Sequence, residues 1–246
     1  MKNMKIGSLL MVTIVSILTL SLVTDSSFST ISVYAVSNSS LTKFGLMPYK
    51  MCYGNPSPKM NWSNCYFFNA RLNFASMAGA NLSGAVFMHS TIKYTDLSGA
   101  NLAGADLSNV DFSGTNLSGA NLKGANLQNA DFYHANLSGV DLQGANLKGA
   151  KFPSANFQNA NLAGVNLSGG SAQVASFQDA NLQNANLSDS RLSTADFSGA
   201  DLRGVNFENA DISWGSLAGA NLIGANVGGL DYSDVDLSCI GHLICA

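Results

Sequence analysis

A five-residue repeat dominates this chain and limits what it can fold into. Residues 65–239 contain thirty-five consecutive copies of the pattern Ala-Asn-Leu-x-Gly or Ala-Asp-Leu-x-x, as in Ala120 to Gly124. The third position is Leu in twenty copies and Phe in nine, and the first position is Ala in twenty-two. Asn or Asp fills the second position in twenty-five copies. No insertion or deletion interrupts the phase, so we interpret the period as structural.

A period of five fits neither a helix nor a long strand. A helix needs apolar residues at a spacing near 3.6, and a half-buried strand alternates apolar and polar residues over its whole length. Here the alternation lasts for one step, apolar-polar-apolar, and two polar or Gly residues follow. Each copy therefore indicates a very short extended segment with a turn after it. Such repeats bury their apolar side chains by stacking on their neighbours, which predicts a solenoid.

Repeats of this form resemble those of the pentapeptide-repeat family, and the resemblance covers about 70% of the chain. It implies an all-β fold, a right-handed quadrilateral β-helix in which four repeats form one square coil. The third-position Leu or Phe and the preceding Ala would point inward. Thirty-five repeats would then give about nine coils. With neighbouring chains roughly 4.8 Å apart, the rod would be about 42 Å long.

Composition argues against a nucleic-acid-binding surface. Only 11% of the residues are charged, well below the roughly 25% of an average domain. Residues 65–239 contain fourteen acidic and seven basic residues, so the repeat array is acidic. A basic patch or stripe, which nucleic-acid binding requires, is not found in it.

The segments on either side of the repeats differ from them in composition. Residues 1–35 indicate a signal peptide, because Lys2 and Lys5 precede an apolar stretch and Val33 to Ala35 supplies a cleavage-like site. An uncleaved membrane anchor is the alternative, which would make the chain membrane-associated. Both interpretations place the repeats outside the cytoplasm: secreted, periplasmic, luminal or at the cell surface. We interpret residues 36–64 as an N-terminal cap or linker and residues 240–246 as a C-terminal cap.

All four cysteines lie near the ends of the repeat array. They are Cys52, Cys65, Cys239 and Cys245. An even number of cysteines in an exported chain indicates disulfides. The two ends of a rod about 40 Å long cannot touch, so we expect the pairs Cys52–Cys65 and Cys239–Cys245. The alternative for Cys65 is a small core residue in place of the usual Ala.

The sequence carries no recognisable catalytic or cofactor motif. Its three histidines, His89, His134 and His242, are far apart. We find no nucleophile elbow, phosphate-binding loop or Cys-x-x-Cys pair. We therefore predict no catalytic residues, no metal ligands and no cofactor, and we expect that the protein is not an enzyme.

Two non-enzymatic functions remain. The first is an exported scaffold whose flat faces bind a protein or a cell-surface polymer; open strand edges at the rod ends would also allow an end-to-end homodimer. The second comes from the resemblance, because some acidic members of the family resemble duplex DNA and occupy the DNA site of type II topoisomerases. The export signal disfavours the second function.

One side of the predicted rod stands out, and we call it the aromatic face. With twenty residues per coil, it is built by the repeats centred on residues 72, 92, 112, 132, 152, 172, 192, 212 and 232. Exposed aromatic residues together with Arg and Lys are typical of interaction surfaces. We therefore predict that this face contacts the partner, and neutral drift on a tolerant surface is the alternative. The predicted contact residues are Tyr94, Tyr133, His134, Lys151, Arg191 and Trp214.

Overall fold

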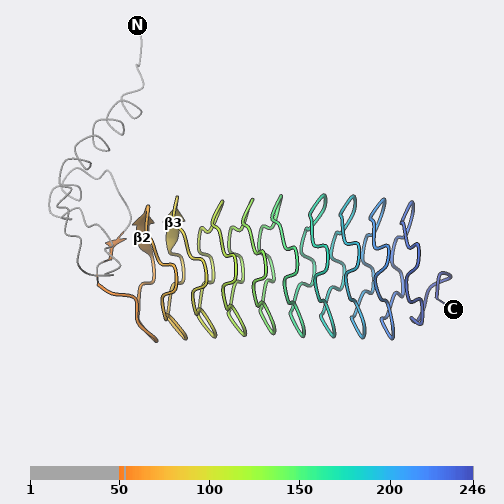
Figure 1. Ribbon diagram of the computed structural model, residues 1–246, viewed down its shortest axis with the longest axis horizontal. Helices are drawn as coiled ribbons and strands as arrows, with labels where there is room; N and C mark the ends of the chain where they lie inside the picture. The colour runs from red at the N-terminus through yellow and green to blue at the C-terminus, as the bar shows by residue number, and fades with distance from the viewer. Residues whose placement is uncertain (1–49, 53, 246) are drawn as a thin grey trace, which may run out of the picture.

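The computed structural model describes residues 50–52 and 54–245, which form a straight rod of stacked coils (Figure 1). The predicted signal peptide and residues 36–49 of the predicted N-terminal cap lie outside the described residues. Within the described part of the chain, no helix is long and apolar enough to cross a membrane.

Three short strands lie where the rod begins. They are β1 (Lys50–Met51), β2 (Cys65–Phe68) and β3 (Val86–Met88), and they form a parallel sheet in the order β1-β2-β3. The register pairs Phe67 of β2 with Phe87 of β3, twenty residues further along the chain. β1 pairs with β2 at a separation of only fifteen residues, since Lys50 lies opposite Cys65. β1 thus adds one strand to the edge of the first coil before the regular repeat spacing begins.

The coils are joined to one another by single parallel bridges between residues twenty apart. These bridges run from Asn61↔Asn81 to Ser216↔Asp236. Twenty residues are four repeats, so each turn of the solenoid contains four repeats, as the resemblance implied. Leu122 and Leu142 therefore lie in adjacent coils, where the Leu122 N–H donates to the Asp141 carbonyl at 2.8 Å.

Each repeat folds the same way because its residue types fit one turn. In residues 80–85 the Ser83 N–H donates to the Asn81 side-chain oxygen, and the Ala85 N–H donates to the Leu82 carbonyl. The turn places Gly84 in the left-handed region, with φ at 63°. A short Asn or Asp side chain favours such a turn, and Gly adopts a positive φ without a steric penalty. The residue types that the repeats share are thus those that favour this turn at each corner of the square coil.

The core of the rod is filled by the third-position side chains, stacked in columns. Phe132 packs between Phe112 and Phe152, with ring centroids 4.9 and 5.1 Å apart. Where Thr replaces the first-position Ala, its buried hydroxyl still finds a partner: Thr95 donates to the Leu72 carbonyl at 2.6 Å. Each column is continuous, so every coil depends on the coils before and after it.

Both predicted disulfides are present, one at each end of the rod. Cys52 is bonded to Cys65, and Cys239 is bonded to Cys245. At the first end Trp62 is buried in a third position and Asn61 bridges Asn81, so residues 60–64 form a further repeat in phase.

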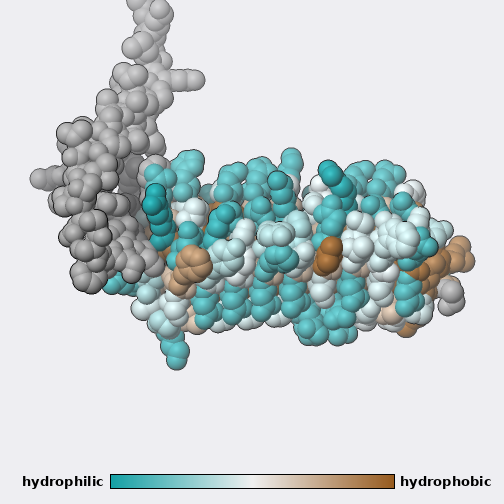
Figure 2. All heavy atoms as spheres, viewed as in Figure 1, coloured by the Kyte–Doolittle hydropathy of each residue, from teal (hydrophilic) through white to brown (hydrophobic). Residues whose placement is uncertain are grey.

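The C-terminal tail covers one side of the last coil. Ile240 exchanges backbone hydrogen bonds with Ala220 and Leu222, whereas Tyr232 is partly exposed in its third position. Leu243 of the same tail is fully exposed. Figure 2 shows the result: the visible side of the rod is mainly hydrophilic with small apolar spots, and a larger apolar area lies at the C-terminal end.

The column geometry predicts a large loss of stability when a charge is placed in the core. Leu142 is fully buried. Leu142→Asp should lower the free energy of unfolding by about 3 kcal/mol or more, because it removes packing and buries an unpaired carboxylate. Urea denaturation measures the change. The adjacent exposed Gln143→Asp is the matched control and should have little effect; similar losses for the two variants would contradict the inward column.

The positions of the disulfides predict where the rod opens first. Each bond closes a short loop, which is worth roughly 2–3 kcal/mol. Reduction should therefore increase amide hydrogen exchange near residues 50–65 and 239–245 before the middle coils, which neighbouring coils still hold. Hydrogen exchange followed by mass spectrometry tests this. A uniform loss of protection along the rod would count against it.

Candidate functional site: the aromatic face

The aromatic face exists as a continuous side of the rod. Its second-position residues are bridged from coil to coil in the order Arg71, Thr91, Asp111, Asp131, Lys151, Ser171, Arg191, Asp211 and Asp231. All six residues predicted to contact a partner therefore belong to one side. Their part in binding remains a prediction.

Most of the large apolar side chains that the rod exposes lie on this face. Phe74, Tyr94, Tyr133, Val174 and Trp214 are 76%, 58%, 49%, 61% and 67% exposed. Tyr232 belongs to the last coil of the same side, and the remaining exposed large apolar residues in the described chain are Ile223, Ile240 and Leu243 near the C-terminal end. The sequence analysis did not include Phe74 in the contact set. The signal was available, because Phe74 fills the same fifth position as Tyr94 and Trp214.

The corner of the aromatic face places unusual residue types at a position with a positive φ. The fifth position of a repeat adopts a positive φ, and on the other three sides it is Gly, Asn or Asp with few exceptions, such as Lys59 and His89. On the aromatic face the same position is Gly or Asp only at Gly114 and Asp234; elsewhere it holds Phe74, Tyr94, His134, Ser154, Val174, Thr194 and Trp214, with φ between 54° and 62°. This conformation costs roughly 1–2 kcal/mol for a residue other than Gly, and is least suited to bulky or β-branched residues.

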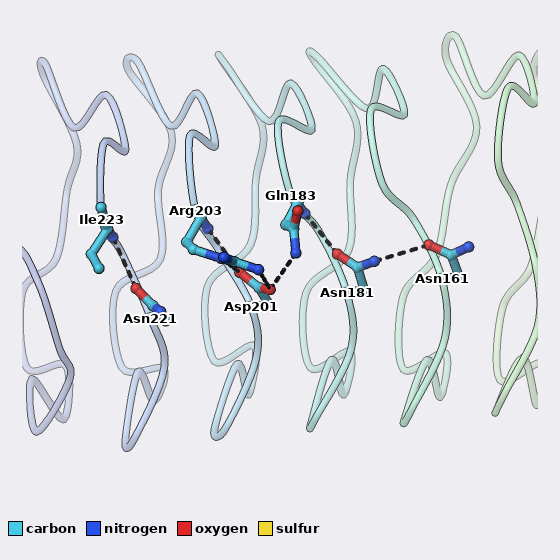
Figure 3. Close-up of polar contacts among 7 residues, drawn as sticks. All are labelled: Asn161, Asn181, Gln183, Asp201, Arg203, Asn221 and Ile223. Atoms are coloured by element: carbon cyan, nitrogen blue, oxygen red, sulfur yellow. Dashed lines mark hydrogen bonds and ion pairs between the residues drawn. The ribbon is translucent and has the colours of Figure 1, made fainter.

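This face also lacks the side-chain hydrogen-bond ladders that stabilise other sides of the rod. Elsewhere, second-position Asn side chains form ladders between coils; the Asn181 amide, for example, donates to the Asn161 side-chain oxygen at 3.3 Å. Figure 3 shows this ladder continuing to Asp201, which accepts hydrogen bonds from Gln183 and Arg203. These contacts, led by the Arg203 hydrogen bond, lower the pKa of Asp201 to about 2. The described side chains of the aromatic face form no such ladder, because Arg, Lys, Thr and Ser interrupt the row.

The charges of the aromatic face are only partly paired. Lys93 and Asp111 form an ion pair of 2.6 Å. Burial opposes ionisation of Asp111, but hydrogen bonds from Lys93 and Ser113 outweigh it and lower the Asp111 pKa. Lys151 and Arg191, in contrast, are exposed and form no ion pair with any residue that the structure describes. The middle of the face therefore offers two cations to a partner.

The exposed rings are ordered by contacts with one another. Phe74 and Tyr94 stack with ring centroids 5.2 Å apart and ring planes 9° apart. The Tyr94 ring lies over Gly114, where a Cβ would overlap it. Tyr133 and His134 are also in contact, with centroids 4.1 Å apart. These rings are held in place on a rigid sheet, which reduces the entropy cost of ordering them on binding.

The arrangement offers a binding surface and no recognisable reaction centre. Across residues 50–52 and 54–245, no three His, Cys, Asp or Glu side chains are grouped so that they could hold a metal ion. His134 is the one histidine on the aromatic face, and its ring contacts Tyr133.

The corner strain predicts that removing a contact residue stabilises the rod. Val174 is β-branched, exposed and has a φ of 61°. Val174→Asn should raise the free energy of unfolding by about 1 kcal/mol, because Asn adopts this conformation more easily. Thermal or urea denaturation measures the difference.

Asn159 provides the matched control for this prediction. It occupies the same corner position on another side, with a φ of 58°. Asn159→Val should destabilise the protein by a similar amount. If both substitutions lower stability, the strain assigned to the corner of the aromatic face is wrong.

Comparison with known proteins identifies a matching family model and a solved structure with a similar fold. The family model described as pentapeptide repeats matches residues 65–104, 105–144, 130–169 and 175–213. The plasmid-mediated fluoroquinolone resistance protein QnrB1 has a similar structure, with a TM-score of 0.58 and 19% identity over 74% of this chain and 92% of QnrB1. This likeness supports the right-handed quadrilateral β-helix and extends to the fold alone.

Two further solved structures are similar mainly in sequence. HetL, a regulator of heterocyst differentiation from Nostoc sp. strain PCC 7120, is 29% identical over 76% of this chain and 92% of HetL, with a TM-score of 0.32. A protein from the Arabidopsis thaliana thylakoid lumen is 35% identical over 45% of this chain and 70% of its own, with a TM-score of 0.19. No curated protein matches the chain significantly.

Proposed function

Because the chain belongs to the pentapeptide repeat family, we propose that it is a non-enzymatic, exported scaffold that binds a protein or surface polymer through its aromatic face. One observation carries this proposal. Three sides of the rod fill the strained corner position almost entirely with Gly, Asn or Asp, whereas six of the nine corner positions of the aromatic face hold Phe, Tyr, His, Val, Thr or Trp. Strained residues that persist on one surface point to a role other than stability.

Export is supported by the cysteines of the described residues. All four form disulfides. Disulfides form and persist in oxidising compartments and are rare in the cytosol. This agrees with the signal peptide predicted for residues 1–35. One relative of this chain is itself a protein of the thylakoid lumen, an extracytoplasmic compartment.

Mimicry of DNA on a topoisomerase is the alternative function. The acidic repeat array and the fold likeness to QnrB1, a fluoroquinolone resistance protein, favour it. The disulfides oppose it because topoisomerases work in reducing compartments. Many of the carboxylates also lie in rows of uncharged Asn, which separates the negative charges along the rod. We therefore favour the scaffold.

A triple substitution of the aromatic face tests the proposed function. Tyr133→Ser, Arg191→Asn and Trp214→Gly replace three contact residues by types that the other sides use. We expect the variant to fold and to lose recovery of the partner that wild type retains from the extracytoplasmic fraction. Binding energy is usually concentrated in a few aromatic and Arg residues, so the loss should be large.

A matched variant changes the same kinds of residue on another side. Ile223→Ser and Lys123→Ser remove an exposed apolar residue and a cation outside the aromatic face. This variant should retain the partner. Unchanged recovery by the triple variant, with an intact circular dichroism spectrum, would overturn the proposed function.

A further inference from the structure

From its second coil, the corner row of the aromatic face places aromatic or apolar residues in alternate coils. From the second coil of the face onward it reads Tyr94, Gly114, His134, Ser154, Val174, Thr194 and Trp214. Phe74 precedes this row and stacks on Tyr94, so the two rings form one anchor. Tyr133 contacts His134 and belongs to the same coil. The large exposed side chains therefore recur every second coil.

Of the cations in the second-position row, Lys151 and Arg191 fall in the coils between these anchors, whereas Arg71 lies in the coil of Phe74. Lys151 lies one coil after Tyr133, and Arg191 lies one coil before Trp214. Both cations are second-position residues, whereas the anchors are fourth- and fifth-position residues. The second-position edge of the face thus carries Lys151 and Arg191 among four aspartates, and it runs parallel to an apolar edge along the rod. Along each edge the contact groups repeat at two coils, or about 9.6 Å.

This spacing selects among the conformations that an extended peptide can adopt. In a β-strand, side chains on one face recur at about 6.6–6.8 Å, which falls out of step with the anchors after one repeat. In a polyproline II helix, every third residue shares an edge, and three residues rise about 9.3 Å. Over the distance from Tyr94 to Trp214 the mismatch would stay near 1 Å.

We propose that the aromatic face binds an acidic, proline-rich peptide segment in the polyproline II conformation, lying along the rod. Its prolines, one in every three residues, would pack on Tyr94, Tyr133, Val174 and Trp214. A second edge of the same helix would present two acidic side chains, three residues apart, to Lys151 and Arg191. Aromatic surfaces are suited to such segments because the ligand is already extended before binding. This inference rests on the proposed function and names the partner's chemistry.

The carboxylates of the second-position row limit the acidic stretch. Asp131 precedes Lys151 by one coil, and Asp211 follows Arg191 by one coil. A uniformly charged acidic polysaccharide would place anions over both aspartates, which would repel it. A peptide avoids this repulsion, because its acidic residues can be confined to the two positions that face the cations. This charge pattern favours a peptide over a surface polymer.

A synthetic peptide tests the proposal directly. The peptide Pro-Pro-Gln-Pro-Pro-Glu-Pro-Pro-Glu-Pro-Pro-Gln should bind saturably and change the fluorescence of Trp214, which is exposed, whereas Trp62 is buried. Binding should weaken as salt is added, since exposed charges contribute. Replacing both Glu residues by Lys, or placing them next to each other, should weaken binding about tenfold or more. Equal binding of the altered peptides would overturn the proposal.

Two variants of the protein test the edges separately. Lys151→Ser with Arg191→Asn should weaken binding of the peptide about tenfold or more, while Lys123→Ser with Ile223→Ser should leave it unchanged. Trp214→Thr with Thr194→Trp keeps the composition and moves one anchor by a single coil, to a corner that already has a φ of 60°. This variant should also lose affinity, and a retained affinity would contradict the two-coil spacing.

The results separate this inference from the function on which it rests. If the peptide does not bind but the triple variant loses its natural partner, the peptide proposal is overturned and the scaffold stands. Binding of polygalacturonate that depends on Lys151 and Arg191, without binding of the peptide, overturns the proposal in favour of an acidic polysaccharide. If the triple variant retains its partner and the peptide does not bind, both are wrong.

Discussion

The whole structure depends on the stacking of coils of equal length. Within the stack, third-position side chains are buried by the coil before and the coil after, as Phe132 is between Phe112 and Phe152. The backbone follows the same rule, because the N–H of one coil donates to a carbonyl twenty residues away. A single inserted residue would shift every later side chain out of its column. This explains why the phase stays intact even at residues 170–174, where the usual residue types are lost.

The corner turn imposes a second constraint, and the four sides meet it differently. A positive φ suits Gly, Asn and Asp, and three sides use these residues almost throughout. The aromatic face accepts strain at Val174, Thr194 and Trp214 and also lacks the Asn ladders. The disulfides and the long Phe and Leu columns supply stability that can offset these costs. Under the proposed function, stability and recognition are thus divided between sides of one rod.

The sequence predicted much of this division. The inward residues and the shared side of Tyr94, Tyr133 and Trp214 followed from the phase of the repeat and from the four repeats per coil that the family resemblance implied. The two local disulfides followed from the positions of the cysteines at opposite ends of the rod. Phe74 was not among the predicted contact residues, although it fills the same fifth position as Tyr94 and Trp214. The pairing of Lys93 with Asp111 was also not predicted, because it depends on how far one side chain reaches into the next coil.

By itself, the sequence determined which side chains face inward and where the chain turns, whereas the structure extended the array to residues 60–64. A five-residue period carries this information, because every copy repeats the same backbone conformation. The period alone does not say how many copies close a coil, and that number decides which residues become neighbours. The family resemblance implied four copies, and the tertiary structure placed residues twenty apart in contact. Distances across the stack also decide that Lys151 and Arg191 form no ion pair among the described residues. The same distances set the two-coil spacing of the exposed side chains Tyr94, Tyr133, Val174 and Trp214.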